Sequence, residues 1–334
     1  MTSKTIVTPM PPMTTTRPES PSMLSVVAGL AVALVIAAAP LAAAEPGGKP
    51  ARPSKKPADA PAAAPTAAPA DGLSVDLGNG LSMLFARIPA GTFLMGSPET
   101  EQGRSTDEGP QHEVTISRPF FMGMLPVTQA QYQEVMGDNP SVTARGGDFP
   151  VDNVRWEQAV EFCRKLSKKT GKTVRLPTEA EFEYATRAGT TTRYFYGADA
   201  YDIKQLGAYA WTFKDCKNDL QPVGRKRPNP WGLHDTYGMV WQWCSDWYAD
   251  GYPAGKQTDP QGPETGTERV LRGGAWCVGP HADEDRLGRM LPRSAVRGVT
   301  GTWYKWPAPG SVAKLGREYT QVGRIGFRVV VELR

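Results

Sequence analysis

Residues 269–276 read RVLRGGAW, and this block carries most of the information about the fold class when it is combined with its neighbours. One neighbour, Gly232–Trp243, reads GLHDTYGMVWQW, and another, Gly326–Val329, reads GFRV. Two earlier blocks read PVTQ over Pro126–Gln129 and RLPTEAEFEYATRAG over Arg175–Gly189. Because no low-complexity linker separates these blocks, we predict one domain over residues 73–334. That length is enough to bury a sizeable core.

The N-terminal residues differ in composition from this domain. An apolar run over Leu24–Ala39 is followed by Pro40 and by three alanines that precede Glu45. This is the layout of a secretory signal peptide over residues 1–44, with cleavage favoured. An uncleaved N-terminal anchor is the alternative, because the run is near the lower length limit for a membrane span. Either route predicts an exported protein: periplasmic, cell-envelope or secreted. Contact with a membrane is expected only through an uncleaved anchor.

Residues 45–72 are rich in proline and alanine and contain no large apolar side chain. Such a segment cannot bury enough surface to offset its chain entropy, so we expect a disordered linker. The formal net charge of the chain is +4, and the domain contains no basic run. Binding to nucleic acid is therefore not expected.

Three helices are predicted from their first and last residues. Thr128 begins the first with a capping box, because Gln131 follows three residues later. The second covers residues 156–169, and the third begins with the capping box of Thr178 and Glu181. Apolar residues recur at spacings of three and four on the second helix, which predicts one buried stripe: Ala159, Phe162, Cys163 and Leu166. On the third helix, Phe182 and Ala185 are expected to point inward.

Short strands are predicted over residues 84–89, 92–95 and 120–124. Alternating apolar residues from Phe327 to Leu333 predict one final strand.

Together the five blocks resemble the sulfatase-modifying factor family, whose best-known member is the formylglycine-generating enzyme. The resemblance covers residues 84–334. It implies an α+β fold of the C-type-lectin-like kind, with short sheets, a few helices and much irregular backbone. It also implies an oxidoreductase in which two cysteines hold Cu(I) and oxidise a cysteine of the substrate.

The chain departs from the family at those cysteines. Cys277 stands one place early, and counting from the family pattern places the pair at Val278 and Asp283. Counting back from the later block Arg293–Ala295 places the second at Arg289, again not a cysteine. The family's active-site serine is Ala275 here. Cys277 remains a catalytic candidate if Cys244 or Cys216 joins it, and Trp241 is a second candidate. We do not expect copper, because Cu(I) ligation needs two soft ligands close together.

The resemblance also implies a calcium site in the block around Asp235. The family binds the ion through an acidic or amide side chain, two backbone carbonyls and a glutamate, which correspond here to Asp235, Gly238, Val240 and Gln242. Calcium prefers several hard oxygen ligands. Because Gln242 supplies a neutral oxygen, we name calcium as the candidate cation and expect reduced affinity. The alternative is that Trp241 and its neighbours only pack.

Two stretches, between Gly274 and Arg293 and over Val299–Gln321, are longer than is usual in the family. The second contains an aromatic cluster. Loop aromatics form peptide- or sugar-binding platforms, so we name four candidates for a substrate groove: Trp276, Trp303, Tyr304 and Trp306. The alternative is a lid that covers the core.

Four cysteines allow three pairings, which sequence cannot separate. In the family, the helix cysteine that matches Cys163 pairs with one just after GFR, where this chain has Val329. We therefore predict that Cys163 is a free, buried thiol.

These observations favour an exported formylglycine-generating-enzyme-like domain that lacks the copper-binding pair. Its predicted role is to bind a polypeptide or glycan, or to act as an enzyme of altered chemistry. The alternatives are a copper-dependent oxidoreductase that generates formylglycine or oxidises another side chain, and a structural protein of the envelope.

Overall fold

The computed structural model describes residues 64–142, 145–200, 202–212, 215–216, 219–275, 293–299 and 325–333. All of them belong to one unit, Lys56–Arg334. The predicted signal peptide or anchor lies outside the described residues, as do Cys277, Trp276, Trp303, Tyr304 and Trp306. Within the described ranges, no helix combines the length and the apolar character that a membrane span requires.

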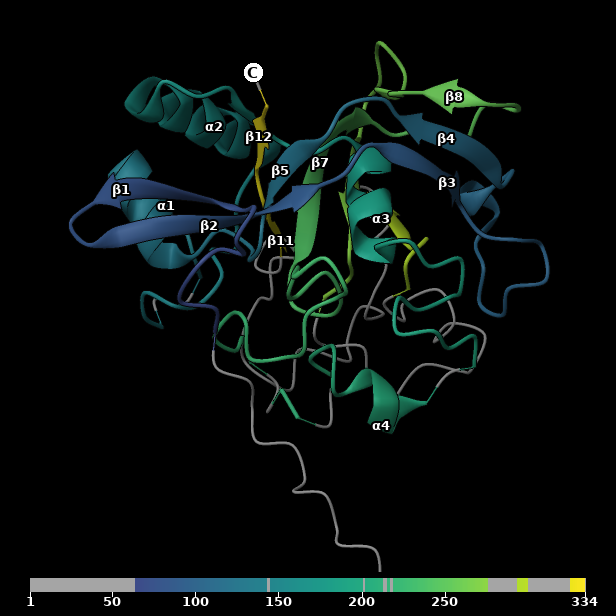
Figure 1. The fold of residues 1–334 in the computed structure, drawn as a ribbon, viewed down its shortest axis with the longest axis horizontal. Helices are drawn as coiled ribbons and strands as arrows, with labels where there is room; N and C mark the ends of the chain where they lie inside the picture. The colour runs from purple at the N-terminus through teal and green to yellow at the C-terminus, as the bar shows by residue number, and fades with distance from the viewer. Residues whose placement is uncertain are drawn as a thin grey trace, which may run out of the picture. The chain divides into compact units, whose positions relative to one another are not determined.

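In the described ranges, the strands form three sheets, and their arrangement can be followed in Figure 1. The first has the order β1-β2-β5-β12-β6: Leu73–Gly78, Leu81–Ile88, Phe120–Gly123, Val330–Glu332 and Val174–Arg175. The second has the order β10-β9-β7-β11: Arg297–Val299, Arg269–Arg272, Trp241–Trp247 and Ile325–Gly326. The third has the order β3-β4-β8: Gly91–Met95, His112–Ile116 and Gln257–Thr258.

The three short strands predicted before residue 125 correspond to β2, β3 and β5. β2 and β3 belong to different sheets. β1 was not predicted; it pairs with β2 through a turn in which Asn79 has a φ of 54°. The end of the predicted linker packs on the domain. Pro65 lies so close to Gly224 that a Cβ added to this glycine would be 3.0 Å from Pro65 Cδ.

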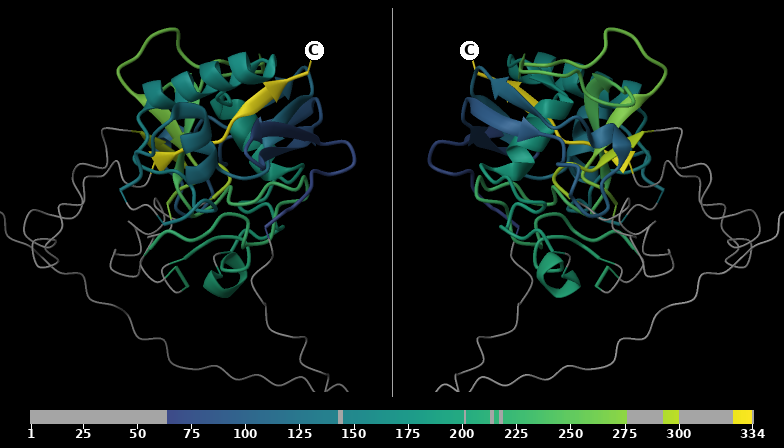
Figure 2. Two further views of the ribbon diagram at one scale, coloured as in Figure 1. Left: turned by 90° about the vertical axis from the view of Figure 1, so that its left-hand side faces the viewer. Right: turned by 90° about the vertical axis from the view of Figure 1, so that its right-hand side faces the viewer.

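The three predicted helices are confirmed as α1 (Gln129–Met136), α2 (Trp156–Thr170) and α3 (Glu179–Arg187). The backbone N–H of Gln131 donates to Thr128 Oγ1 at 3.3 Å, and Thr128 N–H donates to Gln131 Oε1 at 3.0 Å. Gly171 ends α2 with a φ of 68°. A 3₁₀ turn, η1 (Thr106–Glu108), and the short α4 (Ile203–Leu206) were not predicted. The side views in Figure 2 place α4 on the side of the unit opposite to α2.

The final strand predicted from Phe327 to Leu333 is confirmed only in part, because β12 covers Val330–Glu332 alone. β11 pairs in parallel with β7, and β12 pairs antiparallel with β5 and β6, so the chain passes from the second sheet to the first. Residues 326–331 are all buried, including Arg328, because both faces of this segment are covered. Apolar alternation did not reveal this passage, since a segment that is buried on both faces has no solvent side.

α3 is buried over its whole length, and not only at Phe182 and Ala185. It contacts β3, β7 and β9, and Figure 1 shows it between β7 and β3. Its charged side chains therefore lie inside the protein. Buried charges must be paired to be tolerated, and these pairs form the frame of the candidate site.

Candidate functional site

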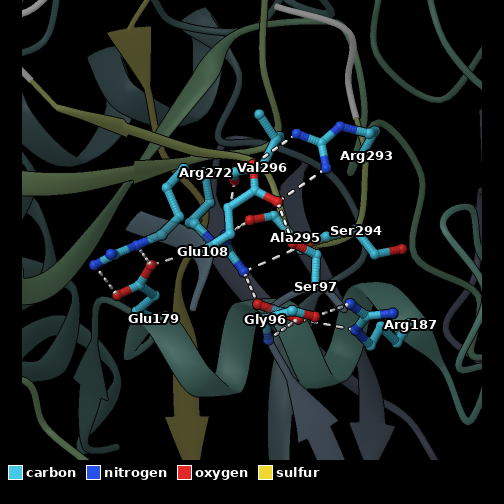
Figure 3. A network of polar contacts seen from close by, with 12 residues as sticks. Gly96, Ser97, Glu108, Glu179, Arg187, Arg272, Arg293, Ser294, Ala295 and Val296 are labelled. Atoms are coloured by element: carbon cyan, nitrogen blue, oxygen red, sulfur yellow. Dashed lines mark hydrogen bonds and ion pairs between the residues drawn. The ribbon is translucent and has the colours of Figure 1, made fainter. Parts of the chain in front are cut away.

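A buried ion network surrounds Glu183 of α3. Figure 3 shows several of its members, including Gly96, Arg187 and Arg272. The Glu183 carboxylate accepts hydrogen bonds from Gly96 N–H at 2.9 Å and Arg187 Nε at 2.9 Å, and it also pairs with Arg272 Nη2. Burial raises the pKa of Glu183, but the positive charges of Arg272 and Arg187 outweigh this effect. The net pKa lies below the ordinary value of 4.5, so Glu183 is ionised at neutral pH.

Two further ion pairs attach the segment 293–299 to the same frame. Arg297 Nε donates to Glu179 Oε1 at 2.6 Å, and Arg293 Nη2 donates to Glu108 Oε1 at 2.6 Å. Glu101 adds a contact of 2.5 Å to Arg293. Bidentate guanidinium–carboxylate pairs fix both position and orientation. This short segment is therefore held firmly against α3 and η1.

Arg272 connects the network to the RVLRGGAW block. Its Nη1 donates to the carbonyl oxygens of Ala295 and Val296, each at 2.7 Å. Arg272 ends β9 and is followed directly by Gly273-Gly274-Ala275. The network thus holds the backbone directly before the positions at which the family has its active-site serine and cysteines. Sequence reasoning missed it, because acidic and basic residues on a helix are usually typical of a solvent-facing surface.

Trp241, a predicted catalytic residue, lies in the core with an exposed fraction of 7%. It belongs to the same apolar cluster as Ala275 and Val296. A Cβ on Gly298 would lie 2.8 Å from Trp241 Cζ3, so the indole packs on the backbone of β10. The structure therefore places Trp241 in the same core cluster as Ala275, with its indole packed on neighbouring backbone, and its predicted catalytic role stays a prediction.

The predicted calcium ligands form a second polar centre. Asp235 is buried with a φ of 51°, and its Oδ2 accepts from Gly224 N–H at 2.6 Å. Its Oδ1 is buried and has no hydrogen-bond partner among the described residues, as is suitable for a cation ligand. Gln242, in contrast, is already engaged: Oε1 accepts from Arg328 Nε at 2.6 Å, and Nε2 donates to Asp235 O at 2.9 Å.

This arrangement fits calcium only in part. Asp235 has one open oxygen, whereas the oxygen of Gln242 already faces a guanidinium group. A cation bound through Gln242 would have to displace Arg328 from a buried site. In the described ranges, no group of three or more His, Cys, Asp or Glu side chains is arranged to hold a metal ion. Calcium at Asp235, Gly238, Val240 and Gln242 stays a prediction.

With this geometry established, comparison with known proteins decides the family. Residues 83–333 match the Sulfatase-modifying factor enzyme 1-like domain family. The chain belongs to this family. The match covers both the Gly232–Trp243 block and the RVLRGGAW block, so the predicted family is confirmed.

Similar proteins and structures agree with this assignment. The chain is 31% identical over 250 residues to the formylglycine-generating enzyme of Streptomyces coelicolor, which covers 57% of this chain and 77% of that enzyme. Its fold is similar to Treponema denticola variable protein 1, with a TM-score of 0.62 and 26% identity over 79% of this chain and 99% of that chain. PvdO from Pseudomonas aeruginosa gives a TM-score of 0.59 with 28% identity, over 78% and 98%. The α+β formylglycine-generating-enzyme-like fold is thus established.

The cysteines of this family member lie in separate places. Cys163 is free and buried, as predicted, and packs in the main core on α2. Cys244 is also buried, on β7 beside Phe182 and Val270. Cys216 packs beside Met239, and Met239 forms a bridge with Ala275, two residues before Cys277. Of the two thiols that were named as partners for Cys277, Cys216 is therefore linked by packing to the end of the RVLRGGAW block.

Proposed function

We propose that this chain is an exported binding domain of the formylglycine-generating-enzyme-like fold, in which oxidation by a copper-held thiol pair is absent. The observation that carries the proposal is Ala275. A methyl group with an exposed fraction of 7% stands in the family's serine position, packed in one cluster with Trp241. A hydroxyl that would contact the reacting group is missing there.

The chemistry of two other thiols, those of Cys163 and Cys244, supports the same conclusion. Cu(I) binds thiolates, and a thiol that is buried in apolar surroundings resists ionisation. Burial raises the pKa of Cys163 above its ordinary value of 9.0, and burial together with the nearby Asp246 carboxylate raises the pKa of Cys244 well above it. Neither thiol is suited to join Cys277 as a copper ligand.

Anaerobic titration of the full chain with Cu(I) tests this part of the proposal. We expect no tight stoichiometric binding in the wild type. The alternative, a copper-dependent oxidoreductase, requires one equivalent of Cu(I) that is lost in both Cys277→Ala and Cys216→Ala. Cys163→Ala is the matched control, because this thiol is buried on α2. Stoichiometric binding lost only with Cys277 and Cys216 would refute the proposal.

For the ligand, we propose an extended polypeptide. The fold is shared with enzymes that the resemblance implies act on a cysteine within a polypeptide, and the aromatic cluster Trp303, Tyr304 and Trp306 is the predicted platform. Selection of displayed random dodecapeptides on the full chain tests this. Enriched peptides should bind one to one and should lose at least tenfold in affinity with Trp303→Ala, whereas Trp231→Phe should leave affinity unchanged. Failure to enrich any peptide, or an affinity that Trp303→Ala leaves unchanged, would contradict the proposal.

Export is part of the proposal. N-terminal sequencing of the mature protein is expected to begin at Glu45, directly after the three alanines. An intact chain in the membrane fraction would favour the anchor instead. Intact chain in the cytoplasm would contradict export.

A further inference from the structure

Arg193 is a buried arginine without a counter-charge among the described residues. Its exposed fraction is 3%, and its Nε and Nη1 have no hydrogen-bond partner in the described part of the chain. The carboxylate of Asp199, six residues away, accepts the backbone N–H of Arg193 at 3.0 Å and makes no ion pair with the guanidinium. A buried cation is costly when it is left unpaired.

The other buried arginines nearby are all compensated. Arg187 and Arg272 share Glu183, Arg293 pairs with Glu108, and Arg297 pairs with Glu179. Arg328 is also buried without an ion pair, but its guanidinium donates to the Gln242 oxygen and to backbone carbonyl oxygens. Arg193 differs because its Nε and Nη1 have neither a counter-charge nor a hydrogen-bond partner among the described residues. A negatively charged group beside the guanidinium would compensate this charge.

One aromatic ring lies against the guanidinium, and a second stacks on the first. Its carbon lies 5.2 Å from the ring centroid of Tyr194, and the rings of Tyr194 and Tyr196 stack at 5.1 Å with an interplanar angle of 6°. The Tyr196 hydroxyl is buried and likewise has no hydrogen-bond partner in the described ranges. Burial raises the pKa of Tyr196, so the hydroxyl stays protonated, although the charge of Arg193 acts in the opposite direction. Two buried donors without hydrogen-bond partners among the described residues, one charged and one neutral, are thus connected through the ring of Tyr194, and the charge of Arg193 acts on Tyr196.

The place of these donors in the fold connects them to the candidate site. Ser294 N–H donates to the carbonyl oxygen of Arg193 at 3.1 Å. The Tyr237 hydroxyl lies 2.6 Å from Ser294 Oγ and accepts from Phe195 N–H at 3.1 Å. The loop that contains Arg193 is therefore joined to the segment 293–299, which the ion network holds beside Ala275.

We propose that Arg193 and Tyr196 bind a carboxylate group of a polypeptide ligand, an inference that rests on the proposed function and specifies its ligand. A guanidinium presents a planar set of N–H donors that matches a carboxylate, and the Tyr196 hydroxyl supplies a further donor. One guanidinium carries one positive charge, which a carboxylate neutralises. A phosphate dianion would leave a negative charge uncompensated in a buried site. The carboxylate belongs either to an acidic side chain or to a C-terminus.

Three capped tripeptides separate these sources: Ac-Ala-Glu-Ala-NH₂, Ac-Ala-Gln-Ala-NH₂ and Ac-Ala-Ala-Ala-OH. Binding to the full chain is followed by NMR, through the shifts of arginine Nε–H resonances, and by the melting temperature. The variants are Arg193→Met, Arg193→Lys and Tyr196→Phe. Arg225→Met is the matched control, because Arg225 is partly exposed and pairs with Asp148.

We expect one or both of the carboxylate peptides to bind and the glutamine peptide not to bind. Arg193→Met should abolish binding, and Arg193→Lys should weaken it at least tenfold because the planar fork is lost. Tyr196→Phe should weaken it severalfold, and Arg225→Met should leave it unchanged. Without peptide, Arg193→Met should melt at a higher temperature than the wild type, because an uncompensated buried charge is removed.

The outcomes that would overturn the inference differ in what they say about the proposed function. The carboxylate site would be refuted if the glutamine peptide bound as tightly as the glutamate peptide, or if Arg193→Met left binding unaffected. Either result would still be consistent with a polypeptide-binding domain. The carboxylate site and the proposed polypeptide-binding function would both be refuted if none of the three peptides shifted an arginine resonance and the dodecapeptide selection also failed. A melting temperature lowered by Arg193→Met would also contradict the inference, because it would assign Arg193 a structural role.

Discussion

Replacing Glu183 with glutamine is the most direct test of the ion network. The substitution preserves the shape of the side chain but removes one buried negative charge. The glutamine oxygen can still accept from Gly96 N–H, which lies 2.9 Å from Glu183 Oε1 in the wild type. The new amide group, however, places N–H donors against donors of Arg187 and Arg272. Both guanidinium groups then share a site with a net positive charge.

The expected loss is large. Removing one partner of a buried ion pair costs about 3–5 kcal/mol, compared with a total stability of roughly 5–15 kcal/mol for a folded domain. At about 2–4 °C per kcal/mol, the melting temperature should fall by roughly 6–20 °C. The effect should also depend on pH. The folded-state pKa of Glu183 is lowered from 4.5, so its contribution is fully present above that value and is lost as the pH falls through the folded-state pKa.

Urea unfolding of the full chain, followed by tryptophan fluorescence at pH 7.5 and again in acid, measures this effect. Glu161→Gln is the control, because Glu161 pairs with Arg164 on the surface of α2 at 2.7 Å. Solvent screening makes such pairs weak, so no detectable change is expected there. Equal stability of Glu183→Gln and Glu161→Gln at pH 7.5 would refute the reasoning. A difference from wild type that does not narrow in acid would show that the charge of Glu183 is not its cause.

Three further predictions concern single positions. Burial, with the nearby Glu179 carboxylate, raises the pKa of Asp246 from 3.8 to about 7. The folded state therefore holds the proton of the Asp246 carboxyl group more tightly than the unfolded state, and the free energy of unfolding falls as the pH rises from 4 to 7. The melting temperature of Asp246→Asn should rise relative to that of the wild type across this pH range. A difference in melting temperature that does not change with pH would contradict this. Gly298→Ala should destabilise by about 1–3 kcal/mol through overpacking against Trp241, and unchanged urea unfolding would disprove the contact. Iodoacetamide at pH 8 should modify Cys163 and Cys244 only in the unfolded chain, because both thiols are buried; peptide mass spectrometry checks this, and labelling of either thiol in the native chain would contradict it.

Local signals in the sequence were sufficient for several elements. The capping boxes at Thr128 and Thr178 predicted where α1 and α3 begin, because the cap and its partner lie three residues apart and need no other part of the chain. The stripe on α2 predicted that Cys163 is buried, since spacing alone places it on the inner face. The order of the motif blocks was enough to predict the family.

Other features were decided by tertiary structure alone. The pairing of Glu183 with Arg272 joins residues 89 positions apart, and no local pattern encodes such a partner. The passage of the chain from β11 in one sheet to β12 in another depends on the packing that buries residues 326–331. Arg193 is an ordinary arginine in the sequence, and only the folded chain shows that it is buried without a counter-charge among the described residues. The sequence alone therefore predicts those features of this protein that depend on local interactions, such as helix caps and buried stripes. The ion pairs between distant residues depend on which charged side chains folding buries together, and only the tertiary structure shows them.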